Sequence, residues 1–546
     1  MSRTRMFEEK KEKLVTNAAG GKAYKMSNTE ALISYVMTGS VDGSYYSSAK
    51  ENVETISQLL NENNDAEFLA KLAVYSRNMG WVRTMPIATL VRVSQLDPAK
   101  FKEIYRMVLK TPKDWKQFID IARSKKIRQG VGRSIKTAGK VTLAEMKPYY
   151  ALKYASDVRD MINIVRPAEK INPHLINYLK GKENATDASG EYFSENEIGA
   201  YFANFERIKS LSTGQEQAEE LLKNKRGGEY PFEAITGTMH MTDEVWGYLM
   251  KISPYMNMIR NVRNFGEKVI KGDVSQATLL ANRISDINNI KKSGMFPFQF
   301  YNAWRTVNIH ATMPTRAKDI LTNALRSAVL TSVENLPDLD IPNGIAIMAD
   351  ISGSMSSIVT GSHSDTRACD LVGLFSAAFK EKYGNKVTML PFEGVVNMSV
   401  KDDFDNATDF FKRAETLTPR GGTNMTAPIE WLLARNMKVD YIVGFTDNES
   451  WVDEYGSFSN HTNFYSQLLE YRRRVNKDVK AYLFTLIPSG TRQTPSNEFC
   501  TYVFGWNENV LRLFGKPNDT QMKDIEAYWN EVTTKNKKVG AGEEDE

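Results

Sequence analysis

The chain has 546 residues, of which 41% are hydrophobic and 25% charged, with a formal net charge of +5. This length exceeds what one hydrophobic core usually serves, so we expect two or three domains. No segment approaches the roughly 20 consecutive apolar residues of a membrane span, and the charged start of the chain has no apolar run that could act as a signal peptide. We therefore expect a cytoplasmic protein without membrane contact.

The two cysteines, Cys369 and Cys500, are too few for a disulfide framework or a cysteine-based zinc site. Because Cys369 falls in a predicted helix and Cys500 in a predicted strand, both are interpreted as packing residues.

The charge is distributed unevenly along the chain. Residues 1–340 carry roughly +11, and the remaining residues roughly −6. Residues 71–140 hold roughly 17 basic and 4 acidic side chains, and the stretch from Arg123 to Lys140 contains about seven bases and no acid. Such a concentration favours a polyanionic partner, although an ordinary solvated helix face would have a similar composition.

The first part of the chain, residues 1–335, shows the apolar spacing of helices rather than the alternation of strands. Asp97-Pro98 is a typical helix start, and the apolar residues of the following stretch recur every three or four positions. Thr111-Pro112 begins the next helix in the same way, and a last long helix is predicted at about residues 316–330. Short, closely spaced helices of this kind predict an all-α array of stacked helix pairs.

A linker is predicted at residues 331–343, and the pattern changes beyond it. Short apolar runs typical of buried strands alternate with amphipathic segments, which predicts a doubly wound, mostly parallel sheet in an α/β domain of residues 340–515. The predicted strands are 344–350, 386–392, 440–446, 480–488 and 499–506, and the predicted helices are 366–383, 426–435 and 465–475. Residues 516–546 are interpreted as a polar C-terminal segment that ends in a frayed acidic tail.

Polar side chains gather where two of these strands end and where one helix begins. Asp350, Ser352 and Ser354 follow the first strand, Thr423 follows two glycines before a helix, and Asp447 follows the third strand. Because ligands bind at the carboxyl ends of parallel strands, these oxygens suit a hard divalent cation, most plausibly Mg²⁺. The alternative is that the two aspartates only cap the turns that follow them.

The same five positions resemble the metal-ion-dependent adhesion site of von Willebrand factor A domains. The resemblance implies that Ser352, Ser354 and Thr423 bind the metal directly, and that Asp350 and Asp447 bind it directly or through water. In that family an acidic group of a protein partner commonly takes the open coordination position.

Catalysis is not indicated by these residues. Ser352 and Ser354 lack the Gly-x-Ser-x-Gly context of a nucleophile, and Thr423 is not part of a Gly-Lys-Ser/Thr phosphate loop. A metal-dependent nuclease would need clustered carboxylates and a nearby general base. We therefore expect a protein that is not an enzyme and has no catalytic residues.

The basic stretch in the helical part is the candidate contact for nucleic acid. Glycines interrupt it and would permit close approach of a phosphate backbone, whose binding would be strongly dependent on salt. The candidate contact residues are Arg123, Lys125, Lys126, Arg128, Arg133, Lys136 and Lys140.

A second resemblance covers nearly the whole chain. The motifs that carry it are Asn17-Ala18-Ala19-Gly20-Gly21, Gly43-Ser44-Tyr45-Tyr46, Gly130 to Lys136, Ile320 to Leu325, and Asp447-Asn448-Glu449. They are similar to the TROVE module and metal loop of the Ro ribonucleoprotein autoantigen family, in which TROVE precedes a von Willebrand A-like domain. Arg133 and Lys136 are carried over as RNA contacts.

The resemblance to the Ro family implies a ring of HEAT-like repeats closed by the A domain. It implies binding of small noncoding RNA and of the single-stranded ends of misfolded or unprocessed RNA, and it makes an exoribonuclease or another protein a candidate partner through the metal site. Residues 154–166 lack the histidine that relatives carry in an RNA-contacting helix and contain Asp157 and Asp160, which makes a Y-type RNA less expected than RNA in general. The rival hypothesis is a cytoplasmic protein-interaction module that acts through the metal site.

Overall fold

The computed structural model describes residues 14–38, 48–124, 129–168, 170–181, 197–223, 230–358, 366–450, 463–487, 489–495, 497–505 and 521–541. Contacts divide the chain into two compact units. The helical unit comprises Val93–Asn335, and the α/β unit comprises Met1–Arg92 together with Leu336–Glu546. Residues 1–92 therefore group with the α/β region, although the whole helical unit separates them in sequence.

The helical unit is built from helices throughout its described residues, as its apolar spacing predicts. None of the described helices has both the length and the apolar character needed to cross a membrane. The helices are α5 (Pro98–Val108), α6 (Pro112–Ser124), α7 (Gln129–Ala144), α8 (Pro148–Lys153), α9 (Ala155–Val165), α10 (Pro173–Leu179), α11 (Glu197–Lys209), α12 (Gly214–Lys223), α13 (Phe232–Thr238), α14 (Asp243–Ile252), α15 (Tyr255–Phe265) with a π-helical turn at Gly266–Ile270, α16 (Val274–Ile284), α17 (Ile287–Ser293), α18 (Pro297–His310) and α19 (Thr315–Val333).

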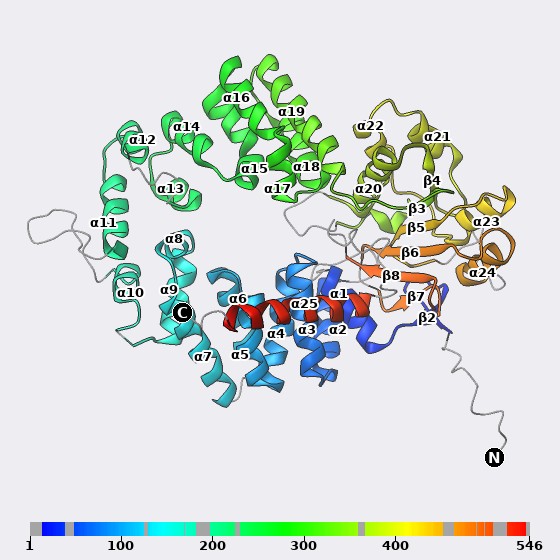
Figure 1. Ribbon diagram of the computed structural model, residues 1–546, viewed down its shortest axis with the longest axis horizontal. Helices are drawn as coiled ribbons and strands as arrows, with labels where there is room; N and C mark the ends of the chain where they lie inside the picture. The colour runs from blue at the N-terminus through cyan, green and yellow to red at the C-terminus, as the bar shows by residue number, and fades with distance from the viewer. Residues whose placement is uncertain are drawn as a thin grey trace, which may run out of the picture. The chain divides into compact units, whose positions relative to one another are not determined.

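Helix α5 shows how local sequence starts these helices and packs them. The Asp97 side chain accepts hydrogen bonds from the backbone N–H groups of the first turn, where Pro98 needs no such partner. One apolar stripe of α5 is buried, and its Phe101 stacks on Phe118 of α6 with ring centroids 5.4 Å apart. Each helix thus buries its stripe against a neighbour, and Figure 1 shows the helices of this unit following one another in chain order.

The α/β unit contains a five-stranded parallel sheet with the order β4-β3-β5-β6-β8. All five predicted strands are present, and the predicted fold class is confirmed. The strands are β3 (Ile345–Asp350), β4 (Val387–Phe392), β5 (Tyr441–Thr446), β6 (Lys480–Thr485) and β8 (Cys500–Phe504). The helices that connect them are α20 (Ala368–Tyr383), α21 (Met398–Asn406), α22 (Phe410–Ala414), α23 (Thr426–Ala434) and α24 (Phe464–Arg474), with short 3₁₀ turns at Gly353–Ser356 and Gly384–Lys386.

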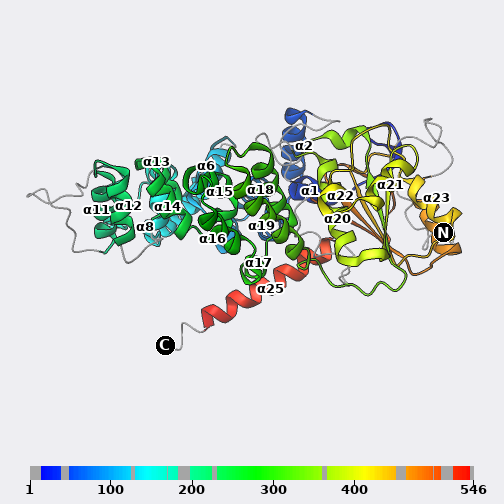
Figure 2. The same cartoon turned by 90° about the horizontal axis from the view of Figure 1, so that it is seen from above.

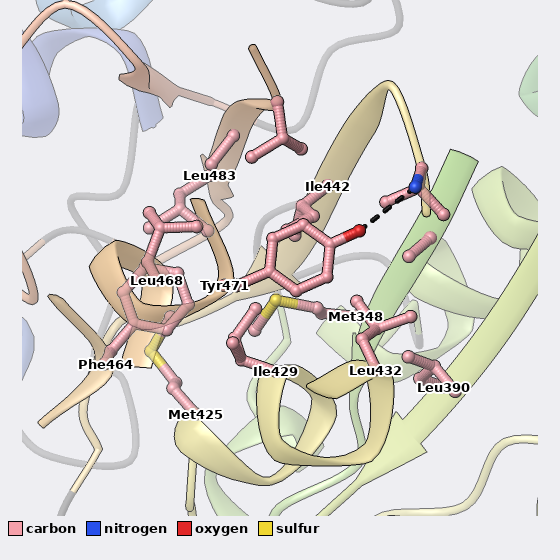
Figure 3. Packing of buried hydrophobic residues seen from close by; sticks show 14 of the residues in the cluster. Met348, Leu390, Met425, Ile429, Leu432, Ile442, Phe464, Leu468, Tyr471 and Leu483 are labelled. Atoms are coloured by element: carbon pink, nitrogen blue, oxygen red, sulfur yellow. Dashed lines mark hydrogen bonds between the residues drawn. The ribbon is translucent and has the colours of Figure 1, made fainter. Parts of the chain in front are cut away.

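Helices cover both faces of the sheet. On one face, α23 and α24 pack on alternate strand residues such as Met348 and Leu483, as Figure 3 shows. Within that core the Tyr471 hydroxyl accepts a hydrogen bond from the Val439 N–H at 3.0 Å, so the buried polar atom is satisfied. On the other face, Phe375 of α20 lies 5.4 Å from Phe445 of β5 between ring centroids.

The N-terminal elements of the α/β unit include a second, antiparallel sheet of order β1-β2-β7. Its strands are β1 (Leu14–Thr16), β2 (Lys22–Lys25) and β7 (Thr491–Arg492), and the helices α1 (Asn28–Thr38), α2 (Ala49–Glu62), α3 (Ala66–Asn78) and α4 (Thr84–Leu96) follow β2. The expectation that everything before residue 335 is helical was therefore wrong for residues 14–25. These strands are too short to show a clear alternation, and β2 depends on pairing with β7, which is distant in sequence.

The predicted linker and the predicted polar C-terminal segment are both partly helical. Helix α19 continues to Val333, so the predicted linker begins inside it. In the C-terminal segment, Gln521–Ala541 forms α25, which Figure 2 shows as one uninterrupted helix in red. Its first turns are held because the Tyr75 hydroxyl of α3 donates to Asp524 Oδ2 at 2.6 Å. The sequence did not predict this helix within the polar segment, and the acidic tail at 543–546 lies outside the described residues.

Both cysteines are free and buried, Cys369 in α20 and Cys500 in β8. Burial raises the pKa of each thiol to about 12, which keeps both thiols protonated. Their interpretation as packing residues is confirmed.

Candidate functional site

The carboxyl edge of the parallel sheet brings together the three polar loops singled out in the sequence. Strand β3 ends at Asp350, and Asp447 directly follows β5, which is the neighbour of β3 in the sheet. The loop before α23 joins them because the Gly353 N–H donates to the Gly421 carbonyl at 3.1 Å. Two strand ends and one helix start therefore meet at one place, as the order of the strands requires.

The Asp350 carboxylate is held in a fixed orientation. The Thr446 hydroxyl donates to its Oδ2 at 2.6 Å, and the Ser352 N–H donates to its Oδ1 at 2.9 Å. The Ser352 and Ser354 hydroxyl oxygens lie 3.0 Å apart and share a hydrogen bond. Three of the five predicted metal ligands are thus tied together by direct contacts.

The other two predicted ligands carry buried oxygens without a partner in the described part of the chain. These atoms are Oδ2 of Asp447 and Oγ1 of Thr423, and each residue is 1% exposed. A buried acceptor without a hydrogen bond costs about 1–3 kcal/mol. Such orphaned oxygens beside a second carboxylate are what a cation site would present before the cation binds.

Burial raises the pKa of both aspartates of this edge. For Asp350 the nearby charge of Asp447 raises it further, against hydrogen bonds from Ser352 and Thr446. For Asp447 a hydrogen bond from the Ser354 side chain opposes the effect of burial. Two neighbouring carboxyls that are both driven towards the neutral form would be stabilised as carboxylates by a divalent cation.

The donor set contains oxygen only: two carboxylates and three hydroxyls. The described residues hold no group of three or more His, Cys, Asp or Glu side chains placed to bind a metal. A cation at this edge would therefore depend on the hydroxyls as well as the carboxylates, and hard cations such as Mg²⁺ accept such ligands. The residues of the predicted set fit that ion: Asp350, Ser352, Ser354, Thr423 and Asp447.

Residues that the sequence did not single out as site residues hold the loop after β5. The Glu449 carboxylate accepts hydrogen bonds from the Ser489 hydroxyl at 2.8 Å and from the Ala18 N–H at 2.9 Å. Burial, and then the charge of Asp447, raises the pKa of Glu449 to about 7. The Ser450 carbonyl accepts from the Asn17 side chain at 2.9 Å. No sequence pattern indicated these long-range contacts, although both segments belong to motifs of the family resemblance.

The basic candidates occupy the end of α6 and one face of α7. Arg123 is exposed on α6, and Arg133 and Lys136 are exposed on α7, with Lys140 half-buried. Positions 133, 136 and 140 share a helix face because they are three and four residues apart. Lys125, Lys126 and Arg128 lie outside the described residues.

The opposite face of α7 is packed. Ile135 and Ala138 are buried, and a Cβ on Gly139 would lie 2.7 Å from Val165 of α9, so that glycine permits close helix packing. The basic face is therefore the one turned to solvent.

Helix α9 contains the two aspartates that depart from the Ro pattern. Asp160 pairs with Lys116 of α6 at 2.8 Å, and both side chains are partly exposed. Part of the negative charge on this helix is thus neutralised within the protein, although exposed ion pairs of this kind contribute little stability.

These features define a protein that joins a helical-repeat array to a von Willebrand A-type domain, whose sheet edge gathers buried oxygen atoms. The TROVE domain family matches residues 232–343, and the Ro60 vWA domain family matches residues 345–515. The chain therefore belongs to the Ro family, which combines these two domains.

The chain is also similar to a curated protein and to a solved structure. The chain is 22% identical over 549 residues to the RNA-binding protein RO60 of Caenorhabditis elegans, and the alignment covers 83% of each chain. The crystal structure of the Ro (RSR) protein of Deinococcus radiodurans is similar with a TM-score of 0.61 and 14% identity, covering 89% of this chain and 99% of that one. At this identity the structural similarity shows the fold.

Proposed function

We propose that this chain is a cytoplasmic, non-enzymatic RNA-binding protein that scaffolds the quality control or processing of RNA. The observation that carries the proposal is the exposed cationic face of α7, with Arg133, Lys136 and Lys140 in a chain whose curated relative is named as an RNA-binding protein. Cations on one solvent-facing helix surface neutralise phosphates without reading base sequence.

The proposed ligands are small noncoding RNA and the single-stranded ends of misfolded or unprocessed RNA. A sequence-independent phosphate contact suits RNAs that share a backbone but not a sequence. A Y-type RNA is less expected as a ligand than RNA in general, because Asp157 and Asp160 on α9 carry charges that oppose phosphate binding at that helix.

We further propose that the sheet edge of the α/β unit holds Mg²⁺ through Asp350, Ser352, Ser354, Thr423 and Asp447. Bound Mg²⁺ would supply a coordination position for an acidic group of a protein partner, such as an exoribonuclease. The buried unpartnered oxygens of Thr423 and Asp447 support this part of the proposal.

The test is the affinity for a structured RNA with a single-stranded 3′ end, measured across salt concentrations. Arg133→Ala/Lys136→Ala should lower the affinity and make the salt slope shallower by about 2, because two phosphate contacts are lost. The matched control is Lys477→Ala/Lys480→Ala, which removes two exposed cations from the α/β unit and should leave the slope unchanged.

Two results would contradict the proposal, one for RNA binding itself and one for the α7 face as its contact surface. One is the absence of RNA binding by the wild type at low salt, which would leave the protein-interaction module as the function. The other is an equal loss of slope in both double variants, which would reject the α7 face as the RNA contact because general charge would then govern binding.

A further inference from the structure

The loop that follows β5 is anchored mainly outside its own strand. Asn448 is fully buried with a left-handed φ of +69°. Its side-chain N–H donates to the Thr491 carbonyl at 2.5 Å, and its own carbonyl accepts from the Gln493 side chain at 2.9 Å. Asparagine adopts a left-handed backbone more readily than most residues, and these contacts hold in that conformation the backbone that presents Asp447.

The N-terminal turn, residues Asn17 to Gly21, is closed by its own hydrogen bonds and contacts this loop. The Asn17 N–H donates to the Gly21 carbonyl at 2.8 Å, and the Gly21 N–H donates back to Asn17 Oδ1 at 2.7 Å. Two donors of the turn bind the loop after β5. The Asn17 side chain donates to the Ser450 carbonyl, and the Ala18 N–H donates to the Glu449 carboxylate. Asn17 is 5% exposed, so the docked turn buries it.

Ser450 connects this turn to the loop that carries Thr423. Its carbonyl receives the Asn17 hydrogen bond, while its hydroxyl donates to the Thr423 carbonyl at 3.3 Å and accepts from the Met425 N–H at 3.1 Å. Asp447 and Thr423, the two predicted metal ligands with a buried oxygen that lacks a partner, are therefore both held by a network that ends at the N-terminal turn.

Glu449 is the second residue of the loop after β5 that the N-terminal turn contacts. It places a buried carboxylate two residues from Asp447, and Ala18, Ala19 and Ser489 hydrogen bond to that carboxylate. Without the N-terminal turn, the Glu449 carboxylate would keep the hydrogen bond from Ser489 and lose those from Ala18 and Ala19. This acidic group at the sheet edge would then have one hydrogen-bond donor instead of three.

We propose that the N-terminal turn is a structural part of the cation site. By holding residues 448–450, it positions Asp447 and Thr423 for a divalent cation, and cation binding in return tightens the docking of the turn. This inference rests on the proposed Mg²⁺ site. The coupling is reciprocal because both events stabilise the same arrangement of one loop.

The experiment compares full-length wild type, Asn17→Ala and Asn28→Ala. Asn17→Ala removes the bond to Ser450 and the internal bond to Gly21. The matched control, Asn28→Ala, removes an exposed asparagine at the start of α1 whose side chain contacts Glu62 instead of the loop. Mg²⁺ affinity is measured by calorimetry, and amide hydrogen exchange of residues 14–25 is measured with and without Mg²⁺.

We expect Asn17→Ala to weaken Mg²⁺ binding by about five- to tenfold, within the usual range of coupling between two sites, and Asn28→Ala to leave it unchanged. In the wild type, saturating Mg²⁺ should slow the exchange of the Ala18 and Gly21 amides. This second measurement needs no variant, so it tests the coupling even if Asn17→Ala does not fold.

Two failures can be told apart. Wild-type binding of Mg²⁺ without any change in exchange at residues 14–25, together with normal affinity of Asn17→Ala, would overturn the coupling and leave the cation site intact. Absence of Mg²⁺ binding by the wild type would overturn the cation site itself, and the coupling with it.

Discussion

The sheet edge of the α/β unit and the basic face of α7 are both polar, but they are organised in different ways. At the edge, Asp350 is 0% and Asp447 1% exposed, and hydrogen bonds from the Thr446 hydroxyl of β5 and from the Glu449 N–H orient their side chains. On α7, Arg133 and Lys136 extend into solvent, and only the opposite face of the helix is packed. The first region depends on the placement of individual atoms, and the second on the number of charges.

This difference has consequences for how each region responds to substitution. In a buried site the loss of one ligand removes a binding function altogether, since water cannot replace the missing group in the same geometry. On an exposed face each cation contributes a similar increment, which salt screens. Substitutions should therefore give all-or-none effects at the edge and graded effects on α7.

The largest expected effect is the loss of stabilisation by Mg²⁺ in Asp350→Ala. At Mg²⁺ about 100-fold above its Kd, the unfolding free energy of the wild type should rise by about 2.7 kcal/mol, and that of the variant should not rise. RNA affinity should stay within a few-fold, because the substitution lies outside the helical unit. Thermal unfolding with and without Mg²⁺ measures the first effect.

The matched control for Asp350→Ala is Asp402→Ala, which removes an exposed carboxylate of α21 and should keep the full response to Mg²⁺. If Asp350→Ala also lost RNA binding, the two regions would not act independently, because both RNA binding and Mg²⁺ binding would then depend on Asp350.

The next effect, of similar size, is expected from a methyl group at Gly421. This residue has φ +64°, which costs about 1–2 kcal/mol for an alanine. The added Cβ would also displace the Glu393 carboxylate, whose hydrogen bond from Asn397 contributes a further ~1 kcal/mol. Urea denaturation of Gly421→Ala measures the sum.

Gly384→Ala is the control for Gly421→Ala because Gly384 has φ +59° and a Cβ there meets no atom within 4 Å. Gly384→Ala should lose only the unfolding free energy that a left-handed backbone costs an alanine, and it should bind Mg²⁺ with the affinity of the wild type. If Gly421→Ala and Gly384→Ala bind Mg²⁺ with equal affinity, the loop that contains Gly421 does not contribute to the cation site.

The smallest effect is expected from Gly132→Ala on α7. A Cβ at this position meets no atom of the protein within 4 Å, so the helix should gain about 0.5–1 kcal/mol from the lower entropy of the unfolded chain. If the α7 face acts through charge alone, RNA affinity should stay within about twofold. A larger loss of RNA affinity, measured beside the urea midpoint, would show that RNA approaches the backbone at this glycine.

Much of the architecture could be predicted from local patterns. The five parallel strands are continuous apolar runs, and the helix starts at Asp97 and Thr111 carry recognisable caps. The residues of the sheet edge were found for a related reason, because parallel strands deliver the residues after their carboxyl ends to one place.

Other elements could not be found in this way. Strands β1, β2 and β7 are two to four residues long, and β2 pairs with a strand near the other end of the chain. Helix α25 begins in a polar segment, where the bond between Tyr75 and Asp524 anchors it to α3. In each case a partner distant in sequence stabilises a segment whose own pattern is weak.

The sequence by itself determined the two kinds of fold, the Asp350, Ser352, Ser354, Thr423 and Asp447 set, and the cationic character of α7. These properties follow from periodicity, from the ends of buried strands and from charge, all of which are local. Only the tertiary structure decided that residues 1–92 group with the α/β region and that the turn at Asn17 holds the loop after Asp447. Hydrogen bonds between segments more than 400 residues apart leave no local pattern, since they depend on how the whole unit packs.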